Sequence, residues 1–265
     1  MGNVRNNTES QFEKLNSDQS IYEVIRIIDG VALFLEDHFN RLRQSMKIQG
    51  IPFHMDCNEF KHNIQYLAEE NKTLNGNIRF VYLKAKNEIK WTFSIIPHSY
   101  PAREEYLKGV TIDLFFAERE NPNAKVIQAT IREGANKMIA DQKLYEVLLV
   151  NRDNLITEGS RSNVFFVKDN VFYTAPASSV LVGVTRKKVI ECLYKLEYML
   201  VEEAVISSEI GNYDAVFLTG TSPGILPVQS IGNQIIDTSH PLVRKLMKQY
   251  DDLIALYIQN EKKIR

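Results

Sequence analysis

The sequence predicts a mixed α/β fold in two parts, and three observations support that prediction. Extended runs rich in β-branched and aromatic residues alternate with amphipathic helical patterns along the 265-residue chain. The segment 118–123 has no apolar residue except Pro122 and separates two parts with different patterns, so we expect a linker there. A hydrophobic share of 44% supplies enough apolar residues for packed cores.

The first part is expected to hold two helices and three strands. Apolar residues recur at helical spacing from 39 to 46 behind Asp37, a plausible N-cap, and Gly50 ends the pattern. A second helix should begin near Asp56, because the apolar residues that follow fall on one side of it. Extended runs predict strands at 78–83, 89–96 and 110–116.

The second part is expected to hold several more strands with helices between them. Helical patterns predict helices at 131–142, 186–196 and 240–258. Extended runs predict strands at 145–150, 155–157 and 215–218. A hairpin is indicated where Asp169 and Asn170 separate two further extended runs, because both residue types tolerate positive φ.

Composition argues against several classes of function. A net charge of −1 and the lack of a dense basic run make nucleic acid an unexpected partner. The polar residues 1–13 do not form a secretory signal, and no window is apolar enough for a membrane span, so we expect a cytoplasmic protein. Cys57 and Cys192 are expected to be buried thiols, and the five scattered histidines suggest no metal site.

Lys125 and Glu158 are candidates for cofactor chemistry. A lysine that forms a Schiff base must lose its proton near neutral pH, which requires partial burial or a cationic neighbour. Apolar residues after Lys125 could bury its stem, and the alternative is a solvated surface charge. Glu158 ends an extended run, where a carboxylate could face a pyridine nitrogen and keep it protonated. The alternative for Glu158 is a charged residue in a turn.

Two later segments could hold a phosphate. Residues 183–186 precede a predicted helix, with Thr185 as a fair N-cap, and helix N-termini attract anions. Residues 219–222 follow a strand and place hydroxyl groups beside Gly220, which lets the backbone approach a ligand closely. Together with the amine and the carboxylate, these segments suit pyridoxal phosphate, which is an aldehyde, a pyridine and a phosphate ester in one molecule.

Two arginines in the first part are further candidates. Arg41 lies on the first predicted helix, and Arg79 lies between apolar neighbours in a predicted strand. A half-buried guanidinium usually has an anionic partner, which can be a ligand or a structural carboxylate. Both alternatives remain open for each arginine.

With these motifs in place, the chain resembles the class IV, fold-type IV pyridoxal-phosphate enzymes. This group includes branched-chain aminotransferases, D-amino acid aminotransferases and aminodeoxychorismate lyases. The resemblance runs from about Tyr22 to Val228 and is most specific over 157–163. It implies two α/β domains with the cofactor between them, and a homodimer. The implied parts are a small N-terminal α/β domain at 1–117, a linker at 118–123 and a larger, β-barrel-like cofactor-binding domain with helices at 124–265.

The resemblance implies a role for each candidate residue. Lys125 would form the Schiff base with pyridoxal 5′-phosphate and act as the general base, and Glu158 would face the pyridine nitrogen. The cofactor phosphate would be bound by Arg41, Val184, Thr185, Gly220 and Thr221. The substrate would be contacted by Arg79, Tyr22 and Arg26.

Three functions are compatible with this resemblance. The first is an aminotransferase that moves an amino group from an amino acid, with a branched-chain-like donor favoured, to a 2-oxo acid. The second is a lyase that eliminates pyruvate from aminodeoxychorismate to give 4-aminobenzoate with the same lysine. The third is a non-catalytic binding protein, suggested by the segment 20–26, which lacks the glycines that many members have there.

Overall fold

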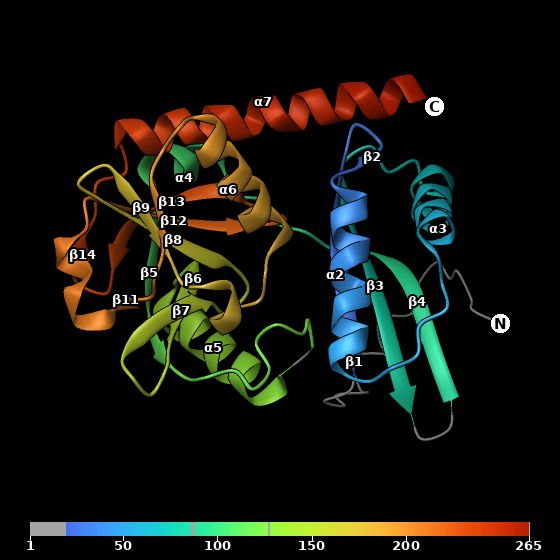
Figure 1. The fold of residues 1–265 in the computed structure, drawn as a ribbon, viewed down its shortest axis with the longest axis horizontal. Helices are drawn as coiled ribbons and strands as arrows, with labels where there is room; N and C mark the ends of the chain where they lie inside the picture. Colours follow the sequence, from blue (N-terminus) through green and yellow to red (C-terminus); the bar gives the residue numbers. More distant parts are fainter. Residues whose placement is uncertain (1–19, 86–87, 127, 265) are drawn as a thin grey trace. The chain divides into compact units, whose positions relative to one another are not determined.

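The structure is a computed structural model that describes residues 20–85, 88–126 and 128–264 (Figure 1). Its contacts divide the chain into two compact units. Unit 1 holds the described residues up to Ser99, the segment Ala124–Ala129 and the residues from Ile254 onward. Unit 2 holds Tyr100–Asn123 and Thr130–Leu253. The contacts place Lys125 with unit 1 and the strand at 110–116 with unit 2. The predicted linker at 118–123 remains a prediction.

Unit 1 is a four-stranded antiparallel sheet with two helices. The strand order is β2-β1-β3-β4. The elements are β1 (Ser20–Ile28), β2 (Val31–Ala32), α2 (Leu35–Ile48), α3 (Cys57–Glu70), β3 (Gly76–Ala85) and β4 (Glu88–Ile96). Both helices and the strands β3 and β4 are as predicted. The strand β1 was not predicted, because the charged Glu23 interrupts the apolar face of its pattern.

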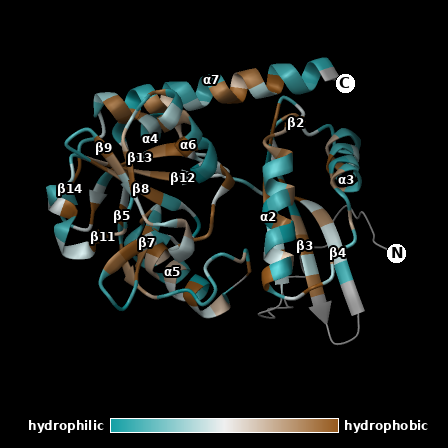
Figure 2. Cartoon of the chain, in the orientation of Figure 1, coloured by the Kyte–Doolittle hydropathy of each residue, from teal (hydrophilic) through white to brown (hydrophobic). Residues whose placement is uncertain are grey.

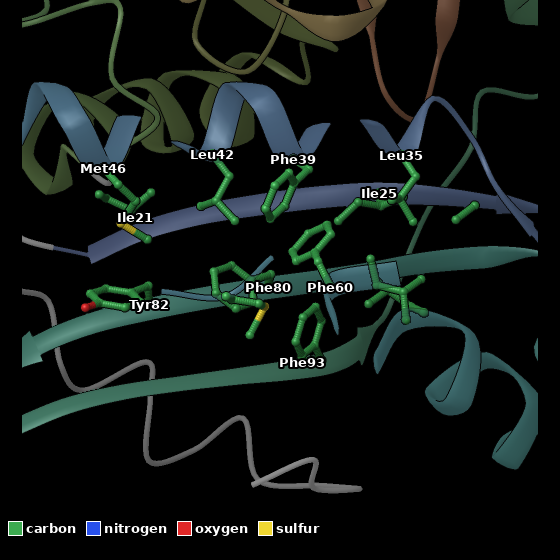
Figure 3. Packing of buried hydrophobic residues seen from close by; sticks show 14 of the residues in the cluster. Ile21, Ile25, Leu35, Phe39, Leu42, Met46, Phe60, Phe80, Tyr82 and Phe93 are labelled. Carbon is green, nitrogen blue, oxygen red and sulfur yellow. The ribbon is translucent and has the colours of Figure 1, made fainter. Parts of the chain in front are cut away.

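The core of unit 1 lies between the two helices and one face of the sheet. Figure 3 shows aromatic side chains of both helices and of the two strands β3 and β4 gathered there. The ring of Phe80 lies 5.5 Å from that of Phe60 on α3 and 4.8 Å from that of Phe93 on β4, measured between centroids. Because strand side chains alternate, the residues between these core positions point to the opposite face of the sheet.

The starts of the two helices differ in their capping. The residue that caps α2 is Phe34, which has a φ of 50°, so the prediction of Asp37 as its N-cap was wrong. Asp37 lies in the first turn of α2, where a carboxylate is favoured by the helix dipole. The helix α3 begins at the predicted place; Asp56 is its N-cap, and its side chain accepts a hydrogen bond of 2.9 Å from the backbone N–H of Glu59.

Unit 2 is built on a long curled sheet with helices around it (Figure 1). The order of its strands is β10-β9-β8-β12-β13-β5-β6-β7-β11, with β14 paired to β13. The strands are β5 (Val110–Phe116), β6 (Glu146–Val150), β7 (Leu155–Gly159), β8 (Asn163–Lys168), β9 (Val171–Thr174), β10 (Leu200–Glu202), β11 (Val205–Ile206), β12 (Ala215–Gly220), β13 (Gly224–Ile231) and β14 (Gln234–Ile235). The helices are α4 (Arg103–Lys108), α5 (Ala129–Gln142), α6 (Val184–Lys195) and α7 (Pro241–Ile264), of which the residues of α7 up to Leu253 belong to unit 2.

The central strands of unit 2 are buried on both faces. Every residue of β6 is buried, and β8 and β12 are buried except for their last residues. Figure 2 shows these strands as predominantly hydrophobic, in contrast to the mixed colouring of the helices. The predicted hairpin joins β8 to β9, and its two turn residues, Asp169 and Asn170, have φ values of 50° and 62°. Two consecutive positive φ values are characteristic of a type I′ hairpin turn.

Three smaller expectations concern the ends of helices, membranes and the cysteines. The residue that caps α6 is Gly183, so the prediction of Thr185 as its N-cap was wrong, and Thr185 lies inside the first turn. Within the described residues, no helix is long and apolar enough to cross a membrane. Both cysteines are free; Cys192 is buried as expected, whereas Cys57 is only half-buried.

Candidate active site

Lys125 is anchored in unit 1 between β1 and α2. Its carbonyl oxygen accepts a hydrogen bond of 3.2 Å from the backbone N–H of Tyr22, and the next residue, Val126, forms a bridge with Ile21. The backbone N–H of Lys125 donates to the hydroxyl oxygen of Ser45 on α2, at 3.1 Å. The side chain is half-buried, and its Nζ lies 4.6 Å from the ring centroid of Tyr22. The predicted partial burial of this lysine is therefore confirmed.

Beside this lysine, unit 1 contains a buried carboxylate with two basic partners. Glu23 is fully buried and accepts hydrogen bonds from Arg41 Nε at 2.8 Å and Arg41 Nη2 at 2.6 Å. Its second basic neighbour is His38, whose Nδ1 lies 2.8 Å from Glu23 Oε2. Burial alone would raise the pKa of Glu23, but the charge and hydrogen bonds of Arg41, with the hydrogen bond of His38, lower it to about 2.

The same cluster keeps His38 neutral. Burial lowers the pKa of the His38 imidazole, and the attraction of Glu23 only partly opposes that effect. The positive charges of Arg41 and Lys125 lower this pKa further, which places the lysine within electrostatic reach of the cluster. Arg41 was predicted to bind the cofactor phosphate, and its Nε and Nη2 atoms donate to Glu23. Its phosphate role remains a prediction.

The three residues predicted to contact substrate share one face of the unit 1 sheet. Tyr22 and Arg26 alternate with buried core positions along β1, so both point away from the helices. Arg79 on β3 pairs directly with Val24, which lies between them on that face. The Nε atom of Arg79 makes no hydrogen bond within the described part of the chain. The sheet thus brings two guanidinium groups to the face that also carries Tyr22.

Glu158 is held in unit 2 at the end of β7. Its side chain is buried, and Oε2 accepts a hydrogen bond of 3.2 Å from the backbone N–H of Leu181. Arg119 Nε lies 3.2 Å from Glu158 Oε1, an ion pair without hydrogen-bond geometry, and Arg119 Nη2 donates to the carbonyl of Ser160 at 2.6 Å. The sequence did not point to Arg119, because it lies in the polar segment that was interpreted only as a linker.

Glu146 is a second buried carboxylate that the sequence did not single out. It accepts hydrogen bonds from Ser160 Oγ at 2.6 Å, from Ser162 Oγ at 3.0 Å and from the backbone N–H of Arg161 at 3.1 Å. These bonds fix the loop between β7 and β8, directly after Glu158. The two serines in the stretch at 157–163 could have indicated such a carboxylate, because buried hydroxyl donors need an acceptor.

The two predicted phosphate segments adjoin one residue, Asn163, at the start of β8. Asn163 Nδ2 donates to the carbonyl of Leu181 at 2.9 Å, just before the cap of α6. On its other side, Asn163 pairs with Thr219, the residue that precedes Gly220 at the end of β12. The hydroxyl of Thr219 is buried and has no hydrogen-bond partner among the described residues. A buried hydroxyl without a partner is unusual unless a ligand or water completes it.

The residues of unit 2 fit pyridoxal phosphate chemically. Glu158 offers a buried carboxylate, the first turn of α6 offers backbone N–H groups at Val184 and Thr185, and Thr219 offers a hydroxyl without a partner. Gly220 and Thr221 follow Thr219 and are half-buried. Within the described residues, no cluster of histidine, cysteine and carboxylate side chains could hold a metal ion.

The chain is similar in sequence and in fold to several known proteins. Residues 20–231 match the family described as amino-transferase class IV. A D-alanine aminotransferase from Bacillus licheniformis is 29% identical over 83% of this chain and 82% of its own length. A probable branched-chain-amino-acid aminotransferase from Thermotoga maritima is 28% identical over 95% of this chain and 92% of its own. The fold matches a putative 4-amino-4-deoxychorismate lyase from Legionella pneumophila with a TM-score of 0.81, at 22% identity over 89% of this chain and 91% of that one.

Proposed function

The chain belongs to the amino-transferase class IV family and is an enzyme, and from this premise we propose that it is a pyridoxal-phosphate-dependent aminotransferase. It would move an amino group from an amino acid to a 2-oxo acid. Class IV aminotransferases use pyridoxal phosphate. The observation that carries the proposal is the set around Asn163, where a buried carboxylate, a helix N-terminus and a buried hydroxyl without a partner all lie within unit 2.

When bound, pyridoxal phosphate supplies an aldehyde and a ring that accepts electrons. In this proposal, Lys125 Nζ binds the aldehyde and later carries the proton that moves at the α-carbon of the substrate. The residue is half-buried and its Nζ lies over the ring of Tyr22, so the amine has a defined position within unit 1. Glu158 holds a proton on the ring nitrogen. Val184, Thr185, Gly220 and Thr221, with Arg41, bind the phosphate.

The proposed substrate residues lie on the face of the unit 1 sheet that is opposite its core. Arg79 would bind a carboxylate, since its Nε has no hydrogen-bond partner among the described residues. Tyr22 and Arg26 lie on the same face and would line the substrate position. A branched-chain-like donor is favoured by several relatives named branched-chain-amino-acid aminotransferases, whereas one relative is named a D-alanine aminotransferase.

Substitution of Lys125 tests the central claim. In Lys125→Ala, turnover should fall more than about a thousandfold because the nucleophile and the base are both removed. After borohydride reduction with added pyridoxal phosphate, peptide mass spectrometry should find the cofactor on Lys125 in the wild-type protein. The exposed Lys137 on α5 provides the matched control, Lys137→Ala, which should keep full turnover. Normal turnover in Lys125→Ala would refute the proposal.

A panel of L- and D-amino acids with 2-oxoglutarate identifies the donor. Transfer from leucine, isoleucine or valine should exceed transfer from D-alanine if the branched-chain assignment is correct. A preference for D-alanine would overturn that assignment and leave the aminotransferase proposal intact.

The lyase is the second candidate, because a protein with that name shares the fold. The two reactions differ in whether they need a 2-oxo acid as an acceptor. Formation of pyruvate and 4-aminobenzoate from aminodeoxychorismate, without any added 2-oxo acid, would favour the lyase. Turnover that requires a 2-oxo acid would favour the aminotransferase. We also propose that the enzyme is a cytoplasmic homodimer.

A further inference from the structure

Asn163 connects the parts of unit 2 that would hold the two ends of the cofactor. It is the first residue of β8 and only 6% of it is exposed. Its backbone pairs with Thr219 at the end of β12, next to one predicted phosphate turn. Its side-chain amide reaches in the other direction, toward Glu158 and the residues that precede α6.

The amide of Asn163 takes part in a closed set of contacts with Glu158 and Leu181. Leu181 donates its backbone N–H to Glu158 Oε2 at 3.2 Å. The carbonyl of the same residue accepts from Asn163 Nδ2 at 2.9 Å, and Nδ2 also lies 3.5 Å from Glu158 Oε2. Both backbone groups of Leu181 are therefore held, one by the carboxylate and one by the amide. This arrangement ties the carboxylate to the segment that leads into α6.

Gly183, the cap of α6, packs directly against the same amide. A Cβ atom on Gly183 would lie 2.2 Å from Asn163 Oδ1, which is far inside van der Waals contact. The next nearest atoms, Asn163 Cγ and Arg186 Cβ, would lie at 3.4 Å and 3.5 Å, which are ordinary contact distances. The amide oxygen of Asn163 thus limits the position of the α6 N-terminus on one side, and only glycine fits at position 183 against that oxygen.

We infer that Asn163 is a positioning residue that fixes the separation between Glu158 and the two phosphate turns. This inference rests on the proposed cofactor. The pyridine ring is rigid, with its nitrogen and its phosphate-bearing carbon at fixed positions, so both ends bind together only when their protein partners are correctly spaced. A fixed spacing makes the second contact effectively intramolecular, which raises the affinity for the whole molecule without adding a contact.

The inference predicts which ligands lose affinity in Asn163→Ala. Pyridoxal phosphate, which uses both ends, should bind at least about tenfold more weakly, because the advantage of simultaneous binding is reduced. Pyridoxal and inorganic phosphate each use one end, so their dissociation constants should change less than about twofold. The matched control is Asn63→Ala on α3, which removes an amide that donates to the carbonyl of Glu59 on the same helix. That variant should bind all three ligands as the wild type does.

A double-mutant cycle with Gly183→Ala tests the packing in the protein without cofactor. Gly183→Ala should lower the melting temperature in the wild-type background, because its Cβ meets Asn163 Oδ1. In the Asn163→Ala background that oxygen is absent, and the same substitution should have little effect. Equal losses in the two backgrounds would mean that the amide does not set the position of the helix N-terminus, and the inference would fail.

The two proposals fail in different ways. If wild-type protein binds no pyridoxal phosphate and Lys125 remains unmodified after borohydride treatment, the proposed function fails and the inference fails with it. If the wild type binds the cofactor and Asn163→Ala weakens pyridoxal as much as pyridoxal phosphate, only the inference is overturned. If the loss is confined to pyridoxal phosphate, Asn163 has the proposed positioning role.

Discussion

Glu23 determines the chemistry of the residues around it. A fully buried carboxylate is unfavourable unless charged and hydrogen-bonded partners compensate for its lost hydration. Arg41 provides that compensation with two hydrogen bonds, and the neutral ring of His38 provides another. The sequence indicated that Arg41 needs an anionic partner and left open whether the partner is a ligand or a protein carboxylate. The structure provides the protein carboxylate.

The titration of this cluster predicts that acid destabilises the protein. The pKa of Glu23 is about 2 in the folded state and 4.5 ordinarily, so its stabilising effect is complete above pH 4.5 and is lost as the pH falls toward 2. The lowered pKa of His38 acts in the same direction, because the unfolded chain gains a proton below about pH 6.5 that the buried ring resists. Urea unfolding between pH 7 and pH 3 should show a steadily decreasing free energy of unfolding.

Glu23→Gln separates the contribution of the carboxylate. It should lower the free energy of unfolding at pH 7 by roughly 3–5 kcal/mol, because Arg41 loses its counter-charge in a buried position. It should also flatten the dependence on pH below 4.5. The exposed Glu104 on α4 provides the control Glu104→Gln, which should keep the wild-type profile. An unchanged slope in Glu23→Gln would contradict the assigned role of Glu23.

At the scale of helices and strands, the local sequence predicted a turn or a helix start correctly where the residues at that position favour it themselves. The hairpin between β8 and β9 is an example, because Asp169 and Asn170 adopt positive φ at small cost. Asp56 likewise caps α3 through its own side chain. The cap of α6 was missed, because Gly183 occupies that position through its packing against Asn163. That neighbour is remote in sequence, so no local pattern reveals it.

Substitutions in the hairpin turn should separate backbone strain from side-chain contacts. Asn170→Gly should leave stability within about 0.5 kcal/mol of the wild type, since glycine adopts positive φ readily. Asn170→Val should lower the free energy of unfolding by roughly 1–3 kcal/mol, because a β-branched residue is strained at a φ of 62°. Urea unfolding at pH 7 measures both. Equal stability of the two variants would argue against the strained turn.

At the scale of the whole molecule, contacts between remote segments regroup the chain. The segment 124–129 follows the predicted linker in sequence, yet the bridge from Val126 to Ile21 attaches it to unit 1. The last turns of α7 also belong to unit 1, where Glu261 pairs with Lys61 at 3.0 Å and the hydroxyl of Tyr257 accepts from the backbone N–H of Leu35. The large unit is therefore not one continuous stretch of sequence.

The proposed homodimer is tested by mass. Light scattering after size-exclusion chromatography should give about twice the chain mass of 30.5 kDa. A concentration series should keep that value at micromolar protein if the dimer is stable. A mass equal to a single chain across the series would refute the dimer.

The sequence by itself determined the class of the fold, most of its helices and strands, and the family, because periodicity, turn residues and the motif at 157–163 are local properties. It also identified Lys125 and Glu158 as candidates. Only the tertiary structure brought Arg119 and Glu146 to the carboxyl end of β7 and its following loop, paired the buried Glu23 with Arg41, and placed Asn163 between Glu158 and the cap of α6. These contacts join residues that are remote from one another in sequence, and no periodic pattern in the sequence relates them. Burial and strand register alone therefore determine which of them meet.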